Sequence, residues 1–149
     1  MTLLKSYYHL CKPNVVYMML ICAFVGMLLA EQSVSSYGYL FISLTGIALC
    51  SASAAAINQV VDRKTDASMT RTDQRPLPQG ELSPTHASIF ALVIGVLGAL
   101  VLYFYVNTLT MTLTIASLIG YAFIYTIYLK RATPQNIVIG GLAGAAPPL

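Results

Sequence analysis

The sequence predicts an all-α fold, a bundle of helices that crosses a membrane several times. Hydrophobic residues make up 57% of the 149 residues, and only 9% carry a charge, whereas roughly 25% are charged in an average globular chain. The mean hydropathy is +0.73, and the charges stand in a few short clusters separated by long apolar stretches that favour a bilayer. This composition excludes a water-soluble globular domain. A net charge of +3 without a basic stripe also excludes a nucleic-acid-binding surface.

Apolar segments recur along the chain, each bounded by charges, prolines or polar turns. A helix needs about 20 mostly apolar residues to cross the hydrocarbon core, and the first four segments are long enough. The fifth is still apolar where the chain stops at Leu149. We therefore expect a polytopic transmembrane bundle of four complete spans plus the start of a fifth, in a chain that is the N-terminal part of a longer protein. The expected segments are residues 14–30, 37–61, 86–106, 109–129 and 135–149.

The basic residues predict which ends of the spans face the cell interior. All 8 Lys and Arg residues fall on one side of the expected spans, and cytoplasmic loops are enriched in these residues. We therefore expect the N-terminus, the 62–85 loop and the 130–134 loop to be cytoplasmic. A cleaved signal peptide is the alternative for residues 14–30, but the segment ends in a poor cleavage site. The basic residues are Lys5, Lys12, Arg63, Lys64, Arg71, Arg75, Lys130 and Arg131.

The strongest functional signal lies at the end of the second apolar segment. If its helix continues to residue 66, Asn58, Asp62 and Asp66 occupy positions i, i+4 and i+8, on one stripe of its surface. An amide oxygen and two carboxylates are hard oxygen ligands. Magnesium is typically bound by one or two carboxylates together with waters and substrate phosphates. The stripe therefore predicts a Mg²⁺ site that holds a diphosphate.

Two arginines follow this stripe. Arg71 and Arg75 carry planar guanidinium groups that match phosphate oxygens. Pro76 disfavours helix at Arg75, so we expect Arg75 in an extended or turn segment that folds back over the site. Metal and arginine together neutralise the charge of a departing diphosphate. The competing interpretation is an ordinary solvated loop beside a span; acids one turn apart at a helix end favour a wet cavity instead.

These residues resemble the UbiA superfamily of intramembrane prenyltransferases, whose first aspartate motif is N-x-x-x-D-x-x-x-D. The stretch from Arg71 to Gly80, R-T-x-x-R-P-L-P-x-G, is similar to the family's loop. Three further stretches resemble the branch of the family that farnesylates haem: Lys12-Pro13, the residues Gly80-Glu81-Leu82-Ser83-Pro84, and the segment from Thr133 to Leu149. The resemblance covers essentially the whole chain but only about the first half of a family member. The second aspartate-rich motif of the family does not occur in this sequence.

The resemblance implies a UbiA-like helical fold and a reaction. Members of this branch transfer a farnesyl group from farnesyl diphosphate to a vinyl group of haem B, with Mg²⁺ assisting the departure of the diphosphate. The implied location is the bacterial inner membrane, with possible contact to proteins of the haem pathway or of terminal oxidase assembly. The residues implied to be catalytic and metal-binding are Asn58, Asp62 and Asp66, and those implied to bind the diphosphate are Arg71, Arg75 and Lys12.

Aromatic residues give a weaker signal in the fourth segment. Tyr121, Tyr125 and Tyr128 recur at helical spacing on one face, and the π-faces of Tyr121 and Tyr125 are suited to shielding a carbocation. The alternative is an interfacial aromatic belt, which is favoured for Tyr125 and Tyr128. His9 and His86 stand near the starts of spans without a partner at metal-ligand spacing, so we interpret them as interfacial.

Other functions remain open at the level of sequence. A 4-hydroxybenzoate prenyltransferase shares the aspartate motif and the arginine loop, but is not expected to share the segment from Thr133 to Leu149. A transporter or channel would place its acids at mid-membrane depth and would not need arginines beside them. A non-catalytic membrane scaffold is the third alternative.

Overall fold

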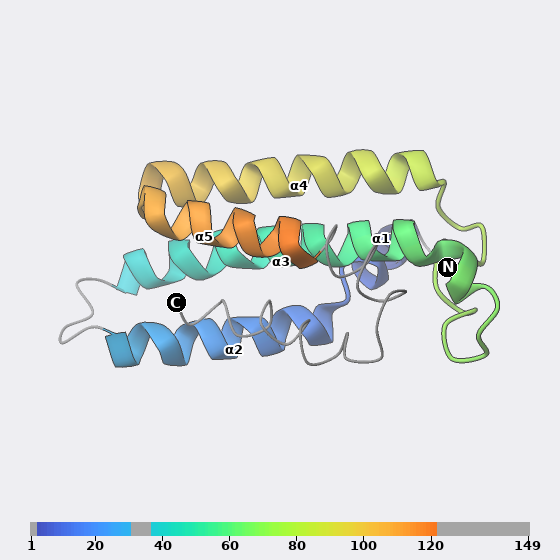
Figure 1. The fold of residues 1–149 in the computed structure, drawn as a ribbon, viewed down its shortest axis with the longest axis horizontal. Coiled ribbons are helices and arrows are strands. Elements are labelled where there is room, and N and C mark those ends of the chain that lie inside the picture. The colour runs from blue at the N-terminus through green and yellow to red at the C-terminus, as the bar shows by residue number, and fades with distance from the viewer. Residues whose placement is uncertain (1–2, 31–36, 122–149) are drawn as a thin grey trace.

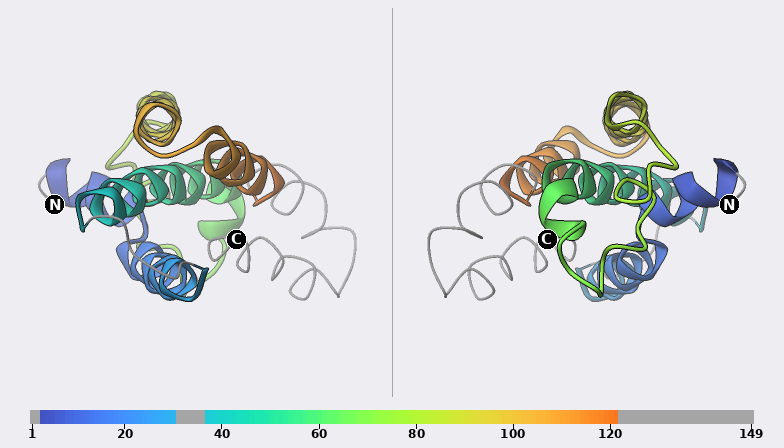
Figure 2. Two further views of the ribbon diagram at one scale, coloured as in Figure 1. Left: turned by 90° about the vertical axis from the view of Figure 1, so that its left-hand side faces the viewer. Right: turned by 90° about the vertical axis from the view of Figure 1, so that its right-hand side faces the viewer.

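A computed structural model describes residues 3–30 and 37–121, and every regular element in this part of the chain is a helix. Helices α2, α3 and α4 run along the same long axis in Figure 1, and Figure 2 shows that α3 lies between α2 and α4. The all-α prediction is therefore confirmed for the described residues. The helices are α1 (Leu3–Leu10), α2 (Pro13–Ala30), α3 (Tyr37–Asp66), α4 (Pro84–Tyr105) and α5 (Thr108–Ile119).

The number of spans is confirmed only in part. In the described residues, α3 and α4 are each long and apolar enough to cross a membrane, which makes the chain a multi-pass membrane protein by length and composition. Helices α1 and α2 form a third span if they are taken together, with a bend of 47° between them. Helix α5 is apolar but has 12 residues. The second part of the expected fourth span, after Tyr121, lies outside the described residues. The whole of the expected fifth segment also lies outside them.

Side-chain caps and prolines determine where the helices begin. Ser83 precedes α4, and its hydroxyl accepts a hydrogen bond of 3.2 Å from the backbone N–H of His86. Asn107 caps α5 in the same way, accepting from the N–H of Thr110 at 2.7 Å. Such caps satisfy N–H groups that have no partner within the helix. Pro84 adds a residue whose fixed backbone angle suits the first turn.

Helices α3 and α4 approach each other closely through small residues. A Cβ atom added at Gly98 would lie 2.8 Å from the Cys50 sulfur and 2.9 Å from the backbone oxygen of Gly46. About two turns nearer the start of α4, the buried hydroxyl of Ser53 donates a 2.7 Å hydrogen bond to the carbonyl of Ala91. Small residues and interhelical hydrogen bonds of this kind replace the hydrophobic driving force that membrane helices lack. This contact places the end of α3 beside the start of α4.

The loop that joins these two helices is folded onto the bundle. Its side chains Leu77 and Leu82 are buried, with 8% and 5% of their surface exposed, and pack in one cluster with Leu10 of α1. Gly80 adopts a left-handed backbone conformation, with φ +71°, which glycine adopts at little cost. Glu81 accepts a hydrogen bond of 2.6 Å from the hydroxyl of Ser6. The loop is therefore tied to α1 as well as to the core.

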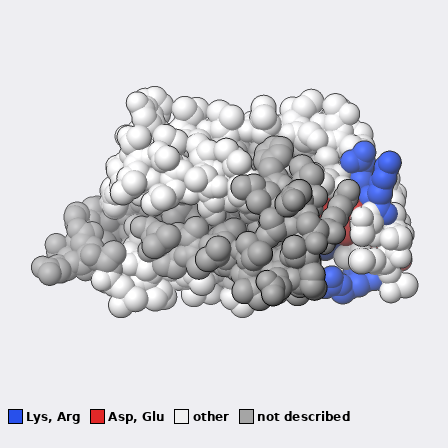
Figure 3. All heavy atoms as spheres, viewed as in Figure 1, with Lys and Arg blue, Asp and Glu red and all other residues white. Residues whose placement is uncertain are grey.

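Charge is concentrated at this end of the molecule. On the face seen in Figure 3, the described Lys, Arg, Asp and Glu side chains lie together at one end, where Figure 1 places α1 and the α3–α4 loop. The rest of that face carries uncharged side chains wherever residues are described. A single charged end is what the distribution of basic residues in the sequence predicts.

Candidate functional site

The polar stripe at the end of α3 is buried. Helix α3 continues without a break to Asp66, which meets the condition for a single stripe and extends the expected 37–61 segment. Asn58, Asp62 and Asp66 are 5%, 4% and 4% exposed. Ionised carboxylates are almost never fully buried unless they are paired or bind a cation. The stripe therefore needs positive charge supplied from its surroundings.

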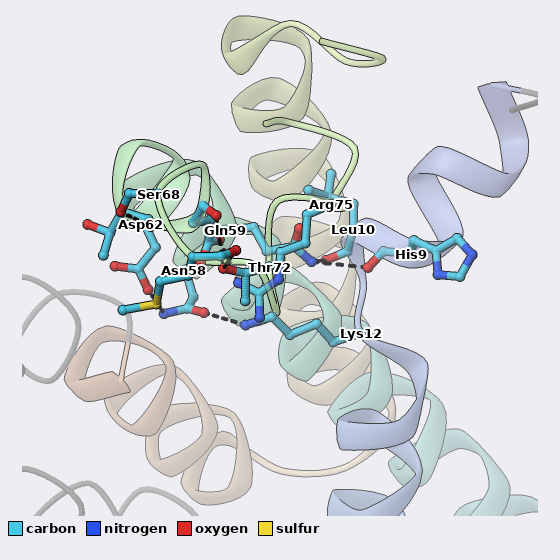
Figure 4. A network of polar contacts seen from close by, with 12 residues as sticks. His9, Leu10, Lys12, Asn58, Gln59, Asp62, Ser68, Thr72 and Arg75 are labelled. Atoms are coloured by element: carbon cyan, nitrogen blue, oxygen red, sulfur yellow. Dashed lines mark hydrogen bonds and ion pairs between the residues drawn. The ribbon is translucent and has the colours of Figure 1, made fainter. Parts of the chain in front are cut away.

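One source of positive charge is Lys12, at the start of α2. Its ammonium donates a hydrogen bond to the side-chain oxygen of Asn58. The amide nitrogen of Asn58 donates in turn to a carboxylate oxygen of Asp62, at 3.1 Å. Figure 4 shows this chain of contacts from Lys12 through Asn58 towards Asp62. A residue assigned to the diphosphate by resemblance thus lies directly against the stripe.

The second source is Arg75. Its Nη1 lies 2.5 Å from Oδ2 of Asp66, and the two side chains are 29% and 6% exposed. The hydroxyl of Thr72 fixes the same turn by donating to the backbone oxygen of Asp66 at 2.9 Å. The expectation that the segment around Arg75 folds back over the site is therefore confirmed.

The structure separates the two arginines of the loop. Arg71 is exposed, while Arg75 is half-buried against Asp66. The structure records no ion pair of Arg71 with the acids of the stripe among the described residues. The assignment of Arg71 to phosphate stays a prediction.

A residue that the sequence analysis did not single out holds the junction of α1 and α2. Gln59 is 2% exposed, and its Nε2 donates hydrogen bonds of 3.0 Å to the carbonyls of His9 and of Leu10. Beyond these carbonyls Lys12 has a φ of +49° and immediately precedes α2. The signal in the sequence is a glutamine inside an apolar helix, next to Asn58. Polar side chains in such helices usually face a protein interior and are hydrogen-bonded there.

The donor set fits Mg²⁺ better than it fits a softer metal. Among residues 3–30 and 37–121 no three His, Cys, Asp or Glu side chains gather into a metal-binding group. His9 and His86 are both exposed. The candidate metal ligands at the stripe are therefore the amide oxygen of Asn58 and the carboxylates of Asp62 and Asp66. Two carboxylates without a closed protein cage are typical of magnesium that also binds substrate phosphates.

A cavity of about 120 Å³ lies between α2, α3 and α5 and has a mainly apolar lining. Two of its lining residues connect it to the sequence predictions: Lys12, which also contacts the stripe, and Tyr121. Tyr125 and Tyr128 lie outside the described residues. An apolar cavity beside a charged cluster suits an amphiphile with an anionic head group. The other lining residues are Val15, Met19, Ile47, Cys50, Ser51, Ala54, Ala55, Thr110, Leu113, Thr114, Ser117 and Leu118.

Comparison with known proteins gives consistent relatives. The chain is 59% identical over 145 residues to protoheme IX farnesyltransferase 2 of Pseudoalteromonas atlantica, which covers 97% of the chain and 48% of that protein. It is 59% identical to protoheme IX farnesyltransferase of Idiomarina loihiensis, covering 97% of the chain and 49% of that protein. For protoheme IX farnesyltransferase 1 of Pseudomonas fluorescens the identity is 57%, over 97% of the chain and 48% of that protein.

The chain thus spans about half the length of the curated relatives it matches. No solved structure matches it. Residues 19–149, which include the whole stripe and the loop after it, match the UbiA prenyltransferase family. The chain therefore belongs to the UbiA prenyltransferase family.

Proposed function

We propose that the chain is part of a haem O synthase, which transfers a farnesyl group from farnesyl diphosphate to a vinyl group of haem B. The observation that carries this proposal is the buried stripe of Asn58, Asp62 and Asp66, approached by Lys12 and Arg75 from two sides. The relatives that are 57% to 59% identical, all protoheme IX farnesyltransferases by name, support the choice of substrates.

In this proposal Asp62 and Asp66 hold Mg²⁺, and Asn58 orients Asp62 or contributes its oxygen. When bound, the metal neutralises the negative charge that develops on the departing diphosphate. The two basic side chains already at the stripe, Lys12 and Arg75, take the diphosphate oxygens in exchange for their present partners. Exposed Arg71 closes over the diphosphate from the loop. In the exchange at Arg75, the buried carboxylate of Asp66 is left beside the metal in place of the arginine, so it keeps a cation as its partner.

The cavity between α2, α3 and α5 receives the isoprenoid chain. Its lining is mainly apolar and includes Lys12, so a chain that lies in it has its charged end near the stripe. Each buried CH₂ group contributes about 0.8 kcal/mol of binding free energy. Exclusion of water also protects an allylic cation from hydrolysis. Tyr121, which lines the cavity, presents an aromatic side chain to that cation.

The competing functions predict other arrangements. An ion path calls for acids within the membrane that face a water-filled channel, whereas Asp66 here is the last residue of its helix and is paired with Arg75. A 4-hydroxybenzoate prenyltransferase would use the same stripe, so the names of the relatives are what favours haem. We place the charged end in the cytoplasm of a bacterial cell with an inner membrane, because basic residues gather there. The partners included in this proposal are proteins of the haem pathway or of terminal oxidase assembly.

The test is a split enzyme. The chain would be produced in one membrane with the C-terminal half of the Pseudoalteromonas relative, supplied with farnesyl diphosphate and haem B, and haem O measured by liquid chromatography. We expect haem O from the pair and none when Asp62→Asn replaces the acid. The matched control is Asp73→Asn, which removes an acid of the α3–α4 loop that is not part of the stripe. Undiminished turnover after removal of Mg²⁺ by a chelator would contradict the metal assignment.

A further inference from the structure

Gln59 is a buried amide that the proposed reaction does not use. It follows Asn58 in α3 but points elsewhere, because successive residues of a helix are about 100° apart around its axis. Its Nε2 donates 3.0 Å hydrogen bonds to the carbonyls of His9 and Leu10. These carbonyls lie at the end of α1, where a helix has no partner of its own for its last oxygens. Gln59 therefore supplies donors that α1 lacks.

One of these two carbonyls also fixes the backbone of Lys12. The N–H of Lys12 donates to the carbonyl of His9 at 3.2 Å, and the carbonyl of Lys12 accepts from the N–H of Val15 at 2.9 Å. Between these bonds Lys12 has a φ of +49°, a left-handed conformation that residues other than glycine rarely adopt. Such a conformation persists only where the surrounding structure imposes it. Gln59 binds the carbonyl on which this arrangement depends.

The side chain of Lys12 returns to the same helix, where its ammonium donates to the oxygen of Asn58. Figure 4 shows the two contacts side by side: Asn58 meets the end of the Lys12 side chain, and Gln59 meets the carbonyls of His9 and Leu10 that precede Lys12. We propose that Gln59 is a positioning residue: it fixes the break between α1 and α2, and thereby sets the Lys12 ammonium on Asn58. The use of that ammonium against a diphosphate rests on the proposed function, whereas the positioning itself does not.

The unpaired oxygen of Gln59 is a cost that its two donated hydrogen bonds must offset. Its Oε1 is buried and has no hydrogen-bond partner among the described residues. A buried acceptor without a partner is unfavourable. An apolar side chain of the same length would fill the space without this penalty. The two hydrogen bonds to the end of α1 are therefore the advantage that glutamine brings.

The test measures two chemical reactivities of the 149-residue chain in detergent micelles, without ligand. Amine acylation of Lys12 is compared with that of exposed Lys5, and thiol alkylation of Cys11 with that of exposed Cys22, each located by peptide mass spectrometry. The variant is Gln59→Met, which keeps the length and removes the donors. We expect both Lys12 and Cys11 to react at least about fivefold faster, the change that the loss of one ordinary hydrogen bond produces.

Two matched variants separate positioning from general loosening. Ser53→Ala removes another buried hydrogen bond from α3 and should leave both rates unchanged. Asn58→Ala should expose Lys12 without affecting Cys11. Unchanged rates in Gln59→Met, faster Cys11 with unchanged Lys12, or the same double increase in Ser53→Ala would each overturn the proposal. If Gln59→Met does not yield a helical, monodisperse chain, Gln59→Asn, one methylene too short to reach both carbonyls, carries the same test.

Addition of Mg²⁺ and inorganic pyrophosphate then tests the proposed function separately. If Lys12 leaves Asn58 for a phosphate oxygen, its acylation rate changes in the unsubstituted chain when both are present and not with either alone. No change would count against the diphosphate site. It would leave the positioning by Gln59 supported, because that result is obtained without ligand.

Discussion

Arg75 lies with its Nη1 2.5 Å from Oδ2 of Asp66, although the two residues are nine positions apart and Asp66 is the last residue of its helix. This pair closes the loop over the end of α3. It also compensates a carboxylate that is only 6% exposed. The loop therefore contributes to stability as well as to the candidate site.

Removal of the Arg75 charge should destabilise the fold. Arg75→Gln leaves the buried Asp66 carboxylate without its cation, and we expect unfolding to become easier by about 1–3 kcal/mol, the usual penalty for an unsatisfied buried group. Unfolding in mixed micelles, followed by far-ultraviolet circular dichroism, measures this. Lys64→Gln removes an exposed charge from the same region and should stay within about 0.5 kcal/mol. Equal effects of the two changes would argue against a structural role for the pair.

Binding of pyrophosphate should depend on Mg²⁺ and on Asp62. Titration calorimetry of the chain with inorganic pyrophosphate should give binding in the presence of Mg²⁺ and little without it. Asp62→Asn should raise the dissociation constant about tenfold or more, which corresponds to at least about 1.4 kcal/mol. Asp73→Asn controls for the loss of an acid outside the stripe and should bind like the unsubstituted chain. Binding that ignores both Mg²⁺ and Asp62 would be incompatible with the stripe as a metal site.

A methyl group at Gly98 should separate α3 from α4. Its Cβ would lie 2.8 Å from the Cys50 sulfur and 2.9 Å from the Gly46 carbonyl oxygen, and a backbone atom cannot rotate away. We expect Gly98→Ala to lower stability by about 1–3 kcal/mol, as overpacking usually does. Gly120→Ala, where nothing lies within 4 Å of the added atom, should be neutral or stabilising by up to about 1 kcal/mol. A neutral Gly98→Ala would show that the helices are not in close contact.

Gly80 should tolerate asparagine better than alanine. Its φ of +71° lies in the left-handed region, where a side chain costs about 1–2 kcal/mol unless it is the short polar chain of Asn or Asp. Nothing lies within 4 Å of a Cβ atom added there, so backbone conformation is the only obstacle. Thermal unfolding should place Gly80→Ala below Gly80→Asn, and both below the unsubstituted chain. The reverse order of the two variants would refute this explanation.

The sequence predicted the helical class and the polar stripe because both follow from residue patterns along single helices. The i, i+4, i+8 pattern needs only that α3 reach Asp66, which it does. The turn around Arg75 followed from Pro76, a local effect. The boundaries of α4, expected at 86–106 and found at Pro84–Tyr105, differ by the few residues of a capped first turn.

The features that the sequence did not predict depend mainly on contacts between distant parts of the chain. Helix α1 was missed because it has 8 residues, too few for a clear apolar period, and contains the charged residue Lys5. The pairing of Lys12 with Asn58 joins residues 46 positions apart. Gln59 was missed for the same reason, since only the packing of α1 against α3 shows which groups its amide meets. Arg71 and Arg75 look alike in the sequence, and only the path of the loop distinguishes the exposed one from the paired one.

The close pairing of α3 with α4 also bears on how the protein is made. The glycine contacts, the Ser53 hydrogen bond and both cations that approach the acidic stripe all come from residues 12–102. This hairpin can therefore assemble during translation, while the ribosome is still adding later residues. Asp66 and its partner Arg75 are nine positions apart, so this acid can meet its counter-charge as soon as the loop has been synthesised. Pairing of the last acid of the stripe is thus a local event, open to the chain early in synthesis.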